Sequence, residues 1–576
     1  MKLTDVLAEV LKENKIKHVF GLQGGAVVHI FDSLEKKKIG VTYTHHEQAA
    51  SLASVAYAKT SNNIGCTVVT TGPACTNAMT GLLAAWQDSV PCIFISGQAR
   101  SQHTSYNKKV RQVGTQEVNI CDIVKPITKY AKFIKKKDNF LFELRKAIDI
   151  AKKDRPGPVW LDIPLDHQWS DIKFTKTKVV GNIKKKISKD VNLEKYLKKS
   201  LKPLLILGHG IRTTIGGEKK IKNFINKHKI PFALTWNSAD LFPTKYDLNL
   251  GIIGMSGQRG ANKAVFESDL ILCLGTHLSI PHTTTLFKNY APKAKKIIVN
   301  IDKNQLKNLN VKFDLKINQD IATFLDIFEN KNYKFQNQWE DYSFFKKQNW
   351  YEPKKTKTIN PNVVVRNLTK KIKQKKCIIV DGGGTALYAG FQSSVIGKSD
   401  RLICSSSISA MGTGLAESLG ASKSKNFKKY ICIVGDGSFL MNIQDLQSII
   451  QDKIDILIVV VNNNGYLAIR HTQKEFLKSK FYGTHPDWKL QMPSFKNLSK
   501  GFGIKYFRIK NEKDFDKYQK NLLHDKGPRI CELIVDENQD SLFKQGYKSN
   551  TDGTFAPQPL SEMHPFLSAP IANTNN

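Results

Sequence analysis

The sequence predicts an α/β protein made of three doubly wound domains, each built on a parallel sheet. Short apolar runs alternate with helix-like segments along most of the chain, and glycine-rich turns follow several of the apolar runs. Parallel strands joined by crossover helices produce this alternation. The length of 576 residues suits about three to four domains of ordinary size, and an apolar fraction of 41% is typical of chains with large cores.

The first domain is expected over residues 1–170. A helix of small residues should follow Glu47 and run through Ala58, and another helix should follow the turn at Gly72–Asn77. These helices between apolar runs indicate crossovers between parallel strands. The expected strands are the one ending at Val19–Phe20 and those at Val41–Tyr43, Thr67–Thr71 and Pro91–Ser96.

Two lysine-rich stretches, about 171–195 and 341–358, are interpreted as connections between domains. The second domain is then expected over 196–340 and the third over 359–545. The tail 546–576 is rich in Pro, Ser, Thr and Asn and is expected to form an irregular C-terminal arm. The first and third domains share one pattern, as paired domains of common ancestry would. The expected strands of the last two domains are Pro203–Leu207, Leu270–Leu274, Lys296–Asp302, Ile378–Val380, Tyr430–Val434 and Ile456–Val461.

Charge is the strongest feature of the composition, because 88 basic against 50 acidic residues give a formal net charge of +38. Such a charge permits nucleic-acid binding. The lysines, however, stand in short clusters such as Lys36–Lys38 and Lys135–Lys137, and no helix-turn-helix, zinc-finger spacing or aromatic RNA-binding strand accompanies them. We therefore favour a lysine-rich surface that attracts anionic substrates, and we predict neither a nucleic-acid nor a membrane partner.

The chain is expected to be cytoplasmic. No run of about 18 apolar residues is present, so no transmembrane helix is predicted. The start Met1–Asp5 enters an amphipathic helix pattern without a signal-peptide core. Nine cysteines are dispersed without any CxxC pair, and such a set in apolar runs indicates buried, reduced thiols.

The segment from Gly435 to Gly465 carries the most specific pattern in the chain. Gly435-Asp436-Gly437-Ser438 and Asn462-Asn463-Asn464-Gly465 each follow an apolar run, and Asp436 and Asn463 are 27 positions apart. Neighbouring parallel strands that end at one edge bring such side chains together, where ligands of open α/β sheets bind. A carboxylate and an amide oxygen are hard ligands that suit a magnesium ion also holding a diphosphate. Gly437 allows close approach to phosphate, and a helix starting near Phe439 should direct its amides toward it.

The two halves at this spacing resemble the diphosphate–magnesium motif of thiamine-diphosphate (ThDP) enzymes. The alternative is an ordinary strand–turn–helix, because Gly-Asp-Gly turns are common, but the spacing of both halves disfavours it. The resemblance implies magnesium ligands at the side chains of Asp436 and Asn463 and at the carbonyl of Gly465. It implies cofactor contacts at Gly435, Asp436, Gly437, Ser438, Asn463 and Gly465.

Glu47 is the first candidate for a catalytic residue. It follows an apolar strand and opens a helix of small residues, which should leave its carboxyl partly buried and able to bond a ring nitrogen. The segment Thr44–Ala50 resembles the start of the ThDP-family helix whose glutamate bonds N1′ of the aminopyrimidine, so that the imino form of the cofactor removes its own C2 proton. The alternative is an exposed glutamate favoured by the helix dipole.

Other loops resemble one branch of that family, the acetolactate synthase-like enzymes. Gly24-Gly25-Ala26 and the segment from Thr71 through Asn77 resemble its pyrimidine-side loops, and Gly114–Glu117 resembles the loop whose glutamine faces the reacting carbon. The resemblance implies that Gly25 and Gln116 lie beside Glu47 at the catalytic centre. It implies cofactor contacts at Thr71, Pro73 and Asn77.

The third domain carries two more segments of this kind. Gly383-Gly384-Thr385 falls where the family makes further diphosphate contacts, and Ser409-Ala410-Met411-Gly412 falls where a bulky apolar side chain holds ThDP in its V shape. The resemblance implies that Met411 is this wedge and that the carbonyl of Ser409 accepts from the 4′-amino group. Ordinary loop packing is the alternative for both residues.

The chain departs from biosynthetic acetolactate synthases where an acceptor would bind. Gln23 stands where those enzymes usually carry proline, and Tyr466–Gln473 follows the asparagine motif without their tryptophan. Arg470 and His471 are candidates for binding an anionic or sugar-like acceptor, against the alternative of a solvent-facing helix. The acceptor therefore stays open at the level of the sequence.

FAD also stays open. The middle domain of acetolactate synthases binds a non-reacting FAD, and Gly208–Arg212 after a strand is a candidate start of such a site. A single Gly-x-Gly is weak support. The family's flavin-contacting Arg-Phe-Asp-Asp stretch corresponds here to Thr276–Ile280.

The resemblance covers nearly the whole chain in the expected order. It implies a ThDP- and Mg²⁺-dependent transferase similar to the acetolactate synthase large subunit. The implied reaction is decarboxylation of a 2-oxo acid, with pyruvate as the expected donor, and carboligation of the resulting enamine to an acceptor carbonyl. Because the family places the pyrimidine and diphosphate halves on different subunits, a homodimer or homotetramer is implied.

Several alternatives remain. Gly465–Gln473 and Pro559–Met563 resemble ThDP enzymes that transfer two carbons from pyruvate to a nucleotide-linked keto-deoxysugar in surface polysaccharide synthesis, and a simple 2-oxo-acid decarboxylase or lyase would use the same cofactor. Outside this class, the charge permits a nucleic-acid-binding protein with a vestigial fold. An NAD oxidoreductase is disfavoured, because no GxGxxG with a downstream acidic residue opens the first domain.

Overall fold

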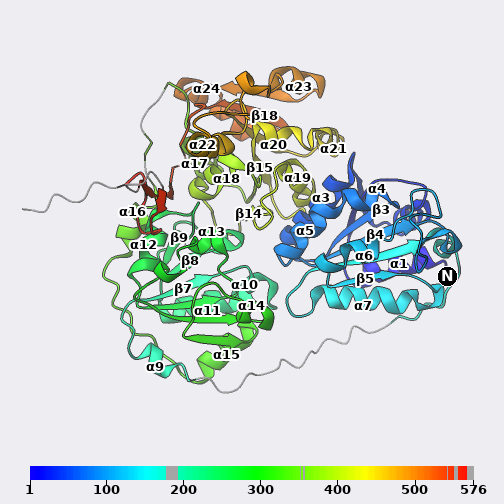
Figure 1. The fold of residues 1–576 in the computed structure, drawn as a ribbon, viewed down its shortest axis with the longest axis horizontal. Helices are drawn as coiled ribbons and strands as arrows, with labels where there is room; N and C mark the ends of the chain where they lie inside the picture. Colours follow the sequence, from blue (N-terminus) through cyan, green and yellow to red (C-terminus); the bar gives the residue numbers. More distant parts are fainter. Residues whose placement is uncertain (177–191, 351, 354–356, 541, 550–554, 567–576) are drawn as a thin grey trace, which may run out of the picture. The chain divides into compact units, whose positions relative to one another are not determined.

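The computed structural model describes residues 1–176, 192–350, 352–353, 357–540, 542–549 and 555–566. The chain divides into two compact units (Figure 1). Unit 1 comprises Met1–Gly181, Gln374–Leu387 and Arg401–Glu537, and unit 2 comprises Asn182–Lys373, Tyr388–Asp400 and Asn538–Asn576. Most of the expected connection at 171–195 lies outside the described residues.

The first sheet of unit 1 has six parallel strands in the order β2-β1-β3-β4-β6-β5. Helices α1, α2 and α7 pack on one face, and α3 and α5 pack on the other. Its strands are β1 (His18–Gly21), β2 (Gly40–Tyr43), β3 (Gly65–Val69), β4 (Cys92–Gln98), β5 (Tyr130–Phe133) and β6 (Pro158–Pro164). Its helices are α1 (Leu3–Glu13), α2 (Val28–Lys36), α3 (Glu47–Ser61), α4 (Pro73–Asn77), α5 (Met79–Gln87), α6 (Ile120–Val124), α7 (Phe140–Lys152) and α8 (Leu165–Gln168).

The second sheet of unit 1 is also fully parallel, in the order β14-β13-β15-β16-β18-β17. Counted from its own first strand, this order is the same as that of the first sheet. The strands are β13 (Lys376–Val380), β14 (Arg401–Ile403), β15 (Lys429–Gly435), β16 (Ile456–Asn462), β17 (Lys505–Ile509) and β18 (Arg529–Ile534). The helices of this part of unit 1 are α19 (Thr413–Lys423), α20 (Asp436–Leu440), α21 (Leu446–Gln451), α22 (Leu467–Phe476), α23 (Phe495–Gly501) and α24 (Glu512–His524). Helix α18 (Gly384–Ser393) begins in unit 1 and ends in unit 2.

Each sheet of unit 1 has a switch point at which the strand order reverses. It lies between β1 and β3 in the first sheet and between β13 and β15 in the second. Ligands of open α/β sheets bind outside the carboxyl ends of the strands at such points. The loops that leave these strands contain Gly25 and Thr71 in the first sheet and Gly383 and Asp436 in the second, so the topology places predicted site residues at both switch points.

Unit 2 contains a six-stranded parallel sheet in the order β12-β11-β10-β7-β8-β9, the order of dinucleotide-binding folds. Its strands are β7 (Pro203–Leu207), β8 (Phe232–Leu234), β9 (Asn249–Ile252), β10 (Leu270–Leu274), β11 (Lys295–Asn300) and β12 (Leu315–Asn318). The helices before the third sheet are α9 (Glu194–Leu197), α10 (Gly210–Thr213), α11 (Gly217–His228), α12 (Arg259–Glu267), α13 (Ile280–Thr283), α14 (Lys303–Lys307), α15 (Ile321–Asn330), α16 (Tyr342–Lys347) and α17 (Pro361–Lys371).

The structure confirms the α/β class and its three parallel sheets, and it differs from the prediction at several boundaries. The helix expected near Phe439 already begins at Asp436. The expected connection at 341–358 contains α16, because the Asp341 side chain accepts from Ser343 N at 2.7 Å and caps a helix start. The expected domain limits stay predictions.

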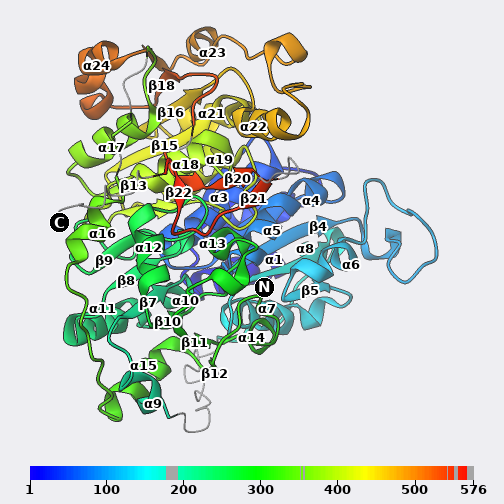
Figure 2. The same cartoon turned by 60° about the vertical axis from the view of Figure 1, so that its left-hand side comes forward.

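The C-terminal arm is more regular than its composition suggests. β19 (Lys544–Gln545) pairs with β22 (Met563–His564), and β20 (Tyr547–Ser549) pairs with β21 (Phe555–Pro557), both in antiparallel register (Figure 2). The described part of the expected irregular arm thus contains short paired strands. Proline and serine disfavour long strands, but they do not prevent two-residue or three-residue ladders.

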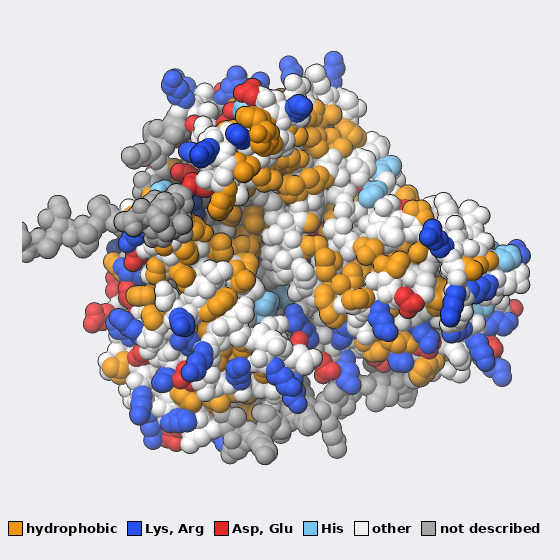
Figure 3. Space-filling view, viewed as in Figure 1, with side chains coloured by type: hydrophobic (Ala, Val, Ile, Leu, Met, Phe, Trp, Pro, Cys, Tyr) orange, Lys and Arg blue, Asp and Glu red, His pale blue; other side chains and the backbone are white. Residues whose placement is uncertain are grey.

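The core and the surface agree with the composition. All nine cysteines lie within the described residues, and all are buried and unpaired with one another. On the face drawn in Figure 3, lysine and arginine side chains are scattered among apolar and uncharged atoms. In the part of the chain that the structure describes, no helix is both long and apolar enough to cross a membrane.

Candidate cofactor site

Asp436 is the centre of the diphosphate-side group. It opens α20 directly after β15, and only 2% of its surface is exposed. Its Oδ1 accepts from Gly437 N at 2.8 Å, and its Oδ2 accepts from Asn463 N at 3.1 Å and from Gly465 N at 2.9 Å. Burial raises the pKa of Asp436 to about 6, although three amides bond it. The two halves of the sequence motif are thus joined through one carboxylate.

Asn463 supplies a test of whether these residues fit a metal ion. Its Oδ1 is buried and has no hydrogen-bond partner, while its Nδ2 donates to Thr385 Oγ1 at 3.3 Å. A buried amide oxygen without a partner is costly unless something else satisfies it. An Mg²⁺ ion bound by few protein oxygens and by a diphosphate would do so. No group of three or more His, Cys, Asp or Glu side chains in the described ranges could hold a metal, so the expected site depends on this mixed oxygen set.

Gly465 requires a backbone that other residues rarely adopt. Its φ is +131°, and a Cβ atom at this position would lie 2.2 Å from Thr484 O. A Cβ atom on Gly437 would lie 2.1 Å from the ring of Tyr466. The glycines of both halves therefore allow the loop after β16 to close tightly over the start of α20.

Arg470 clamps the same loop from α22. The residue is 4% exposed, and its guanidinium donates to the carbonyls of Asn463 at 2.7 Å and Asn464 at 3.1 Å. It also donates to Thr484 O at 3.0 Å and to Glu537 O at 3.1 Å. The expectation that Arg470 binds an acceptor is wrong, because its hydrogen-bond donors already hold the protein backbone.

Asp381 performs a second anchoring role that the sequence reading did not assign. It follows β13, is fully buried, and accepts from Gly383 N at 3.2 Å and Gly414 N at 3.0 Å. Burial raises the pKa of Asp381 to about 6. The carboxyl thereby links the predicted diphosphate loop to the start of α19. An acidic residue directly after an apolar strand was the signal that could have identified it.

The predicted wedge residue lies against this loop. A Cβ atom on Gly383 would be 2.6 Å from Met411 Cγ and 3.2 Å from Ser438 Oγ, so the glycine leaves room for both side chains. Gly384 has a φ of +57° and no atom near its Cβ direction. Ser409 is exposed, has a φ of +47°, and donates from its hydroxyl to Ser406 O at 3.0 Å. The structure thus brings these predicted residues together around the β13–β15 switch point.

The pyrimidine-side group is centred on Glu47. This residue is the first of α3 and is 8% exposed, so the alternative of a solvent-facing helix start is wrong. Its Oε2 accepts from Asn77 Nδ2 at 3.0 Å. Among the described residues no other side chain or amide bonds this carboxyl. Its Oε1 is therefore available to accept a hydrogen bond from a ligand.

Thr71 and Gln116 form the second part of this group. Thr71 Oγ1 lies 2.8 Å from Gln98 Oε1 and 3.3 Å from Gln116 O. A Cβ atom on Gly72 would lie 2.0 Å from Gln116 O, so only glycine allows this approach. The side chain of Gln116 is exposed, as are Gly25 and Pro73. These residues line the β1–β3 switch point.

The Gly208–Arg212 turn, the candidate start of a flavin site, packs against the chain's own backbone. A Cβ atom on Gly208 would lie 2.4 Å from Gly275 O, and one on Gly210 would lie 2.7 Å from Gly275 Cα, so these glycines admit the chain's own backbone. Arg212, the cation of the same turn, pairs with Asp240 at 2.9 Å, and both side chains are almost fully buried. The turn is therefore closely packed against Gly275, and its arginine is already paired.

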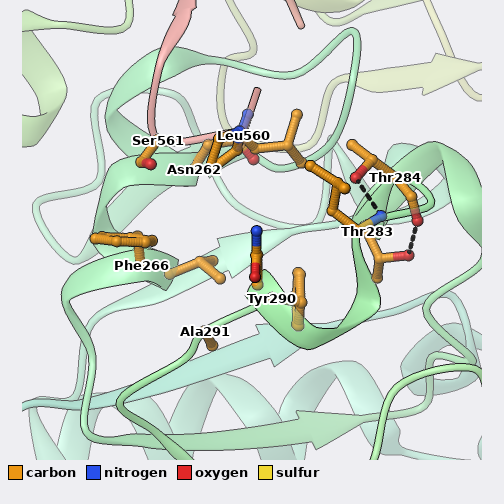
Figure 4. Close-up of a pocket in the computed structure, with 12 residues that line it drawn as sticks. Asn262, Phe266, Thr283, Thr284, Tyr290, Ala291, Leu560 and Ser561 are labelled. Atoms are coloured by element: carbon orange, nitrogen blue, oxygen red, sulfur yellow. Dashed lines mark hydrogen bonds between the residues drawn. The ribbon is translucent and has the colours of Figure 1, made fainter. Parts of the chain in front are cut away.

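A small pocket lies elsewhere in unit 2 (Figure 4). Thr283 and Thr284 use their hydroxyls on the backbone, at 3.1 Å to Thr284 O and 3.1 Å to Leu286 N respectively. No charged side chain lines the pocket, which does not suit a diphosphate. The lining residues are Asn262, Val265, Phe266, Thr283, Thr284, Leu286, Asn289, Tyr290, Ala291, Pro559, Leu560 and Ser561.

Two parallel-sheet domains of identical strand order, one with a buried glutamate at a helix start and the other with a buried aspartate–asparagine pair, define a ThDP enzyme. Three family models match the chain: Thiamine pyrophosphate enzyme, N-terminal TPP binding domain, over residues 1–123; central domain, over 192–327; and C-terminal TPP binding domain, over 382–533. The chain belongs to the thiamine pyrophosphate enzyme family.

Within this family the chain is similar to acetolactate synthase large subunits. It is 30% identical to that of Cyanidium caldarium, with 95% of each chain covered. It is 28% identical to the large subunit of Porphyra purpurea, with 93% of this chain and 92% of the relative covered. It is 29% identical to the large subunit of Haemophilus influenzae, with 87% of this chain and 88% of the relative covered. The protein is thus a ThDP-dependent enzyme of the carboligase type.

Proposed function

We propose that the enzyme decarboxylates pyruvate and ligates the two-carbon fragment to an acceptor carbonyl, with pyruvate itself as the first acceptor to test. The observation that carries this proposal is that one chain holds both a buried Glu47 at the start of α3 and the joined Asp436–Asn463 loop after β15 and β16, in two sheets of the same strand order. The relatives named acetolactate synthase support the same reaction class.

The residues of the chain would act by holding and orienting the cofactor. Thiamine diphosphate, when bound, supplies the nucleophilic carbon and the electron sink. Glu47 would bond the aminopyrimidine ring through Oε1, because Asn77 already holds Oε2. Met411 would support the bent cofactor, and Gln116 would face the reacting carbon. The diphosphate would lie at the β13–β15 switch point with Mg²⁺ on Asp436, Asn463 and the Gly465 carbonyl.

Asp436→Ala is expected to weaken Mg²⁺ and ThDP binding by more than about 100-fold, because loss of a direct ligand should exceed the effect of losing an outer contact. Calorimetric titration with ThDP at saturating Mg²⁺ measures the change without requiring activity. Asp445→Ala is a matched control, because Asp445 is a fully buried aspartate that accepts from His45 N outside the predicted metal set. Unchanged cofactor affinity in Asp436→Ala would remove this residue from the metal site.

The proposed assembly is a homodimer or homotetramer in a cytoplasmic setting. The pyrimidine-side residues of one subunit would meet the diphosphate-side residues of another, as the resemblance implies. A mixture of Glu47→Gln and Asp436→Ala chains tests this arrangement. Subunit exchange should then restore some activity, whereas a site within one chain would leave the mixture inactive.

FAD is left out of the proposed cofactor set, because the glycines of the Gly208–Arg212 turn pack against Gly275 and Arg212 is already paired with Asp240. The purified protein is expected to show no flavin absorption band, and added FAD should not change its turnover. The measurement is the visible spectrum of the protein and of the supernatant after denaturation. Flavin released in a ratio of one per chain would contradict this prediction.

The direct test of the proposed function is release of carbon dioxide from pyruvate, with ThDP and Mg²⁺ present or omitted and with products identified. Cofactor-dependent release with acetolactate as product supports the proposal. Carbon dioxide release without acetolactate would indicate that the acceptor is not pyruvate. No release by protein that binds ThDP would show that pyruvate is not the donor.

A nucleotide-linked keto-deoxysugar is the second candidate acceptor. The exposed loop before Gln116 carries Lys108, Lys109 and Arg111, which would suit a diphosphate-bearing acceptor. Competition between pyruvate and such a sugar distinguishes the two candidates. Preferential consumption of the sugar would favour a transferase acting on it.

A further inference from the structure

The loop that carries Gln116 is anchored to the first sheet by buried polar residues that have no role in the proposed chemistry. It belongs to the long segment between β4 and α6, which extends from the sheet in Figure 2. Gln116 has a φ of +59°, a backbone region that only a few per cent of residues other than glycine adopt. Such a conformation persists only when the surrounding structure imposes it.

Gln98 provides the anchor at the end of β4. The residue is 1% exposed, and its Nε2 donates to Val118 O at 2.9 Å and to Asp162 Oδ2 at 3.0 Å. Its Oε1 accepts from Ala99 N at 2.9 Å and from Thr71 Oγ1 at 2.8 Å. The amide therefore uses both of its N–H groups and both lone pairs, which fixes its orientation.

Asp162 holds Gln98 from the neighbouring strand β6. It is fully buried and accepts from Ser96 Oγ at 2.6 Å and from Tyr106 OH at 3.2 Å, in addition to Gln98. Tyr106 belongs to the loop, and its ring stacks on Phe133 with centroids 4.0 Å apart. One carboxyl thus connects two strands of the sheet with the loop.

Glu117 closes the loop on itself. It is 5% exposed, and its two oxygens accept from Val113 N at 2.8 Å and from Ser105 Oγ at 3.0 Å. The loop therefore has internal bonds from Glu117, an external bond at Val118 O, and an external contact of 3.3 Å between Gln116 O and Thr71 Oγ1. The external contacts fall at Gln116 itself and two residues after it.

We propose that Gln98 and Asp162 are positioning residues that hold the Gln116 loop in the geometry needed for carboligation. The inference rests on the proposed function, because it takes the role of Gln116 from there. Gln98 fixes the position of the loop relative to the first sheet by bonding Val118 O and Thr71. Asp162 keeps the Gln98 amide from rotating. A displaced loop would still allow decarboxylation but would misplace the acceptor, since a misplacement of 1 Å can cost about 100-fold in rate.

The test measures the ratio of ligated product to carbon dioxide released from pyruvate. Gln98→Met keeps the length of the side chain and removes its hydrogen bonds, and it is expected to lower this ratio by about 10- to 100-fold. Asp162→Asn should have a smaller effect, because an asparagine oxygen can still accept from Gln98 while its amide faces Ser96. A loss of folded enzyme alone would lower both products equally and leave the ratio unchanged.

Thr67→Val is the matched control. Thr67 is a fully buried residue of β3 whose hydroxyl donates to Ser54 Oγ at 2.7 Å, so the change removes a buried hydrogen bond from the same sheet without touching the loop. Its product ratio should equal that of the wild type. A control ratio as low as that of Gln98→Met would overturn the proposal, because any loosening of the sheet would then suffice.

Hydrogen–deuterium exchange supplies a readout that does not depend on activity. Peptides covering 105–118 should exchange faster in Gln98→Met than in the wild type or in Thr67→Val. If wild-type enzyme releases no carbon dioxide from pyruvate, the proposed function fails, and exchange alone then decides whether Gln98 anchors the loop. Unchanged exchange together with an unchanged product ratio in Gln98→Met would refute the inference.

Discussion

Glu47→Gln is expected to lower kcat by at least about 100-fold, the smaller end of the contribution of a positioned acid or base. Glutamine keeps the volume of the side chain, and its carbonyl can still accept from Asn77, whose Nδ2 lies 3.0 Å from Glu47 Oε2. It cannot hold the proton that the aminopyrimidine ring needs. ThDP should therefore bind with little change while turnover is lost, as measured by calorimetry and by carbon dioxide release.

Glu143→Gln is the matched control for this experiment. Glu143 has the same exposed fraction as Glu47, 8%, and lies in α7, away from the predicted site residues. Its replacement should leave kcat unchanged. Wild-type turnover in Glu47→Gln would remove Glu47 from the mechanism, and equal losses in both variants would indicate a general loss of folded protein.

Much of the diphosphate-side group could be predicted because polar residues directly follow apolar strands. Asp436 and Asn463 leave β15 and β16, which are neighbours in the sheet, and the structure joins them through Asn463 N. Asp381 carries the same signal after β13 and bonds Gly383 N. The position of such residues directly after a strand predicts that they lie close together, since parallel strands end at one edge of the sheet.

Arg470 could not be assigned in this way. Its partners are carbonyls at Asn463, Asn464, Thr484 and Glu537, the last of them 67 positions away. A charged residue on an amphipathic helix predicts exposure, and only the tertiary fold brings those carbonyls around it. Gln98 and Asp162 could not be assigned from the sequence either. They lie in the apolar strands β4 and β6, and their partners Val118 and Tyr106 come from the loop between β4 and α6.

The three sheets were predictable from alternation, whereas the short elements were not. The small helix α16 and the paired strands of the C-terminal arm depend on one cap or on a few ladder bonds. The free energy of one cap or a few ladder bonds is small, so a segment rich in lysine, proline and serine gives no sequence pattern from which these elements could be predicted. The long apolar runs succeed as predictors because burial of whole strands outweighs these local preferences.

The buried pair Lys59–Asp88 was likewise invisible in the sequence. Lys59 Nζ in α3 lies 2.8 Å from Asp88 Oδ2, with side-chain exposures of 4% and 0%, and it donates to Cys404 O at 2.7 Å. Glu417 in α19 is also fully buried near this ammonium, and burial raises the pKa of Glu417 to about 7. The group ties the first domain to the segment that leads to Ser409.

Lys59→Met is expected to destabilise the protein by about 3–5 kcal/mol, because it removes the positive charge that neutralises the buried Asp88 carboxylate. The measurement is equilibrium unfolding of unit 1 in urea. The double change Lys59→Met with Asp88→Asn should recover much of the loss, since the second change removes the uncompensated charge. Lys36→Met is the control, because the exposed Lys36–Asp32 pair at 2.9 Å should contribute little. A single variant as stable as the wild type would mean that the Asp88 charge is tolerated without Lys59, and the pair would then not hold α3 to the 404–409 segment.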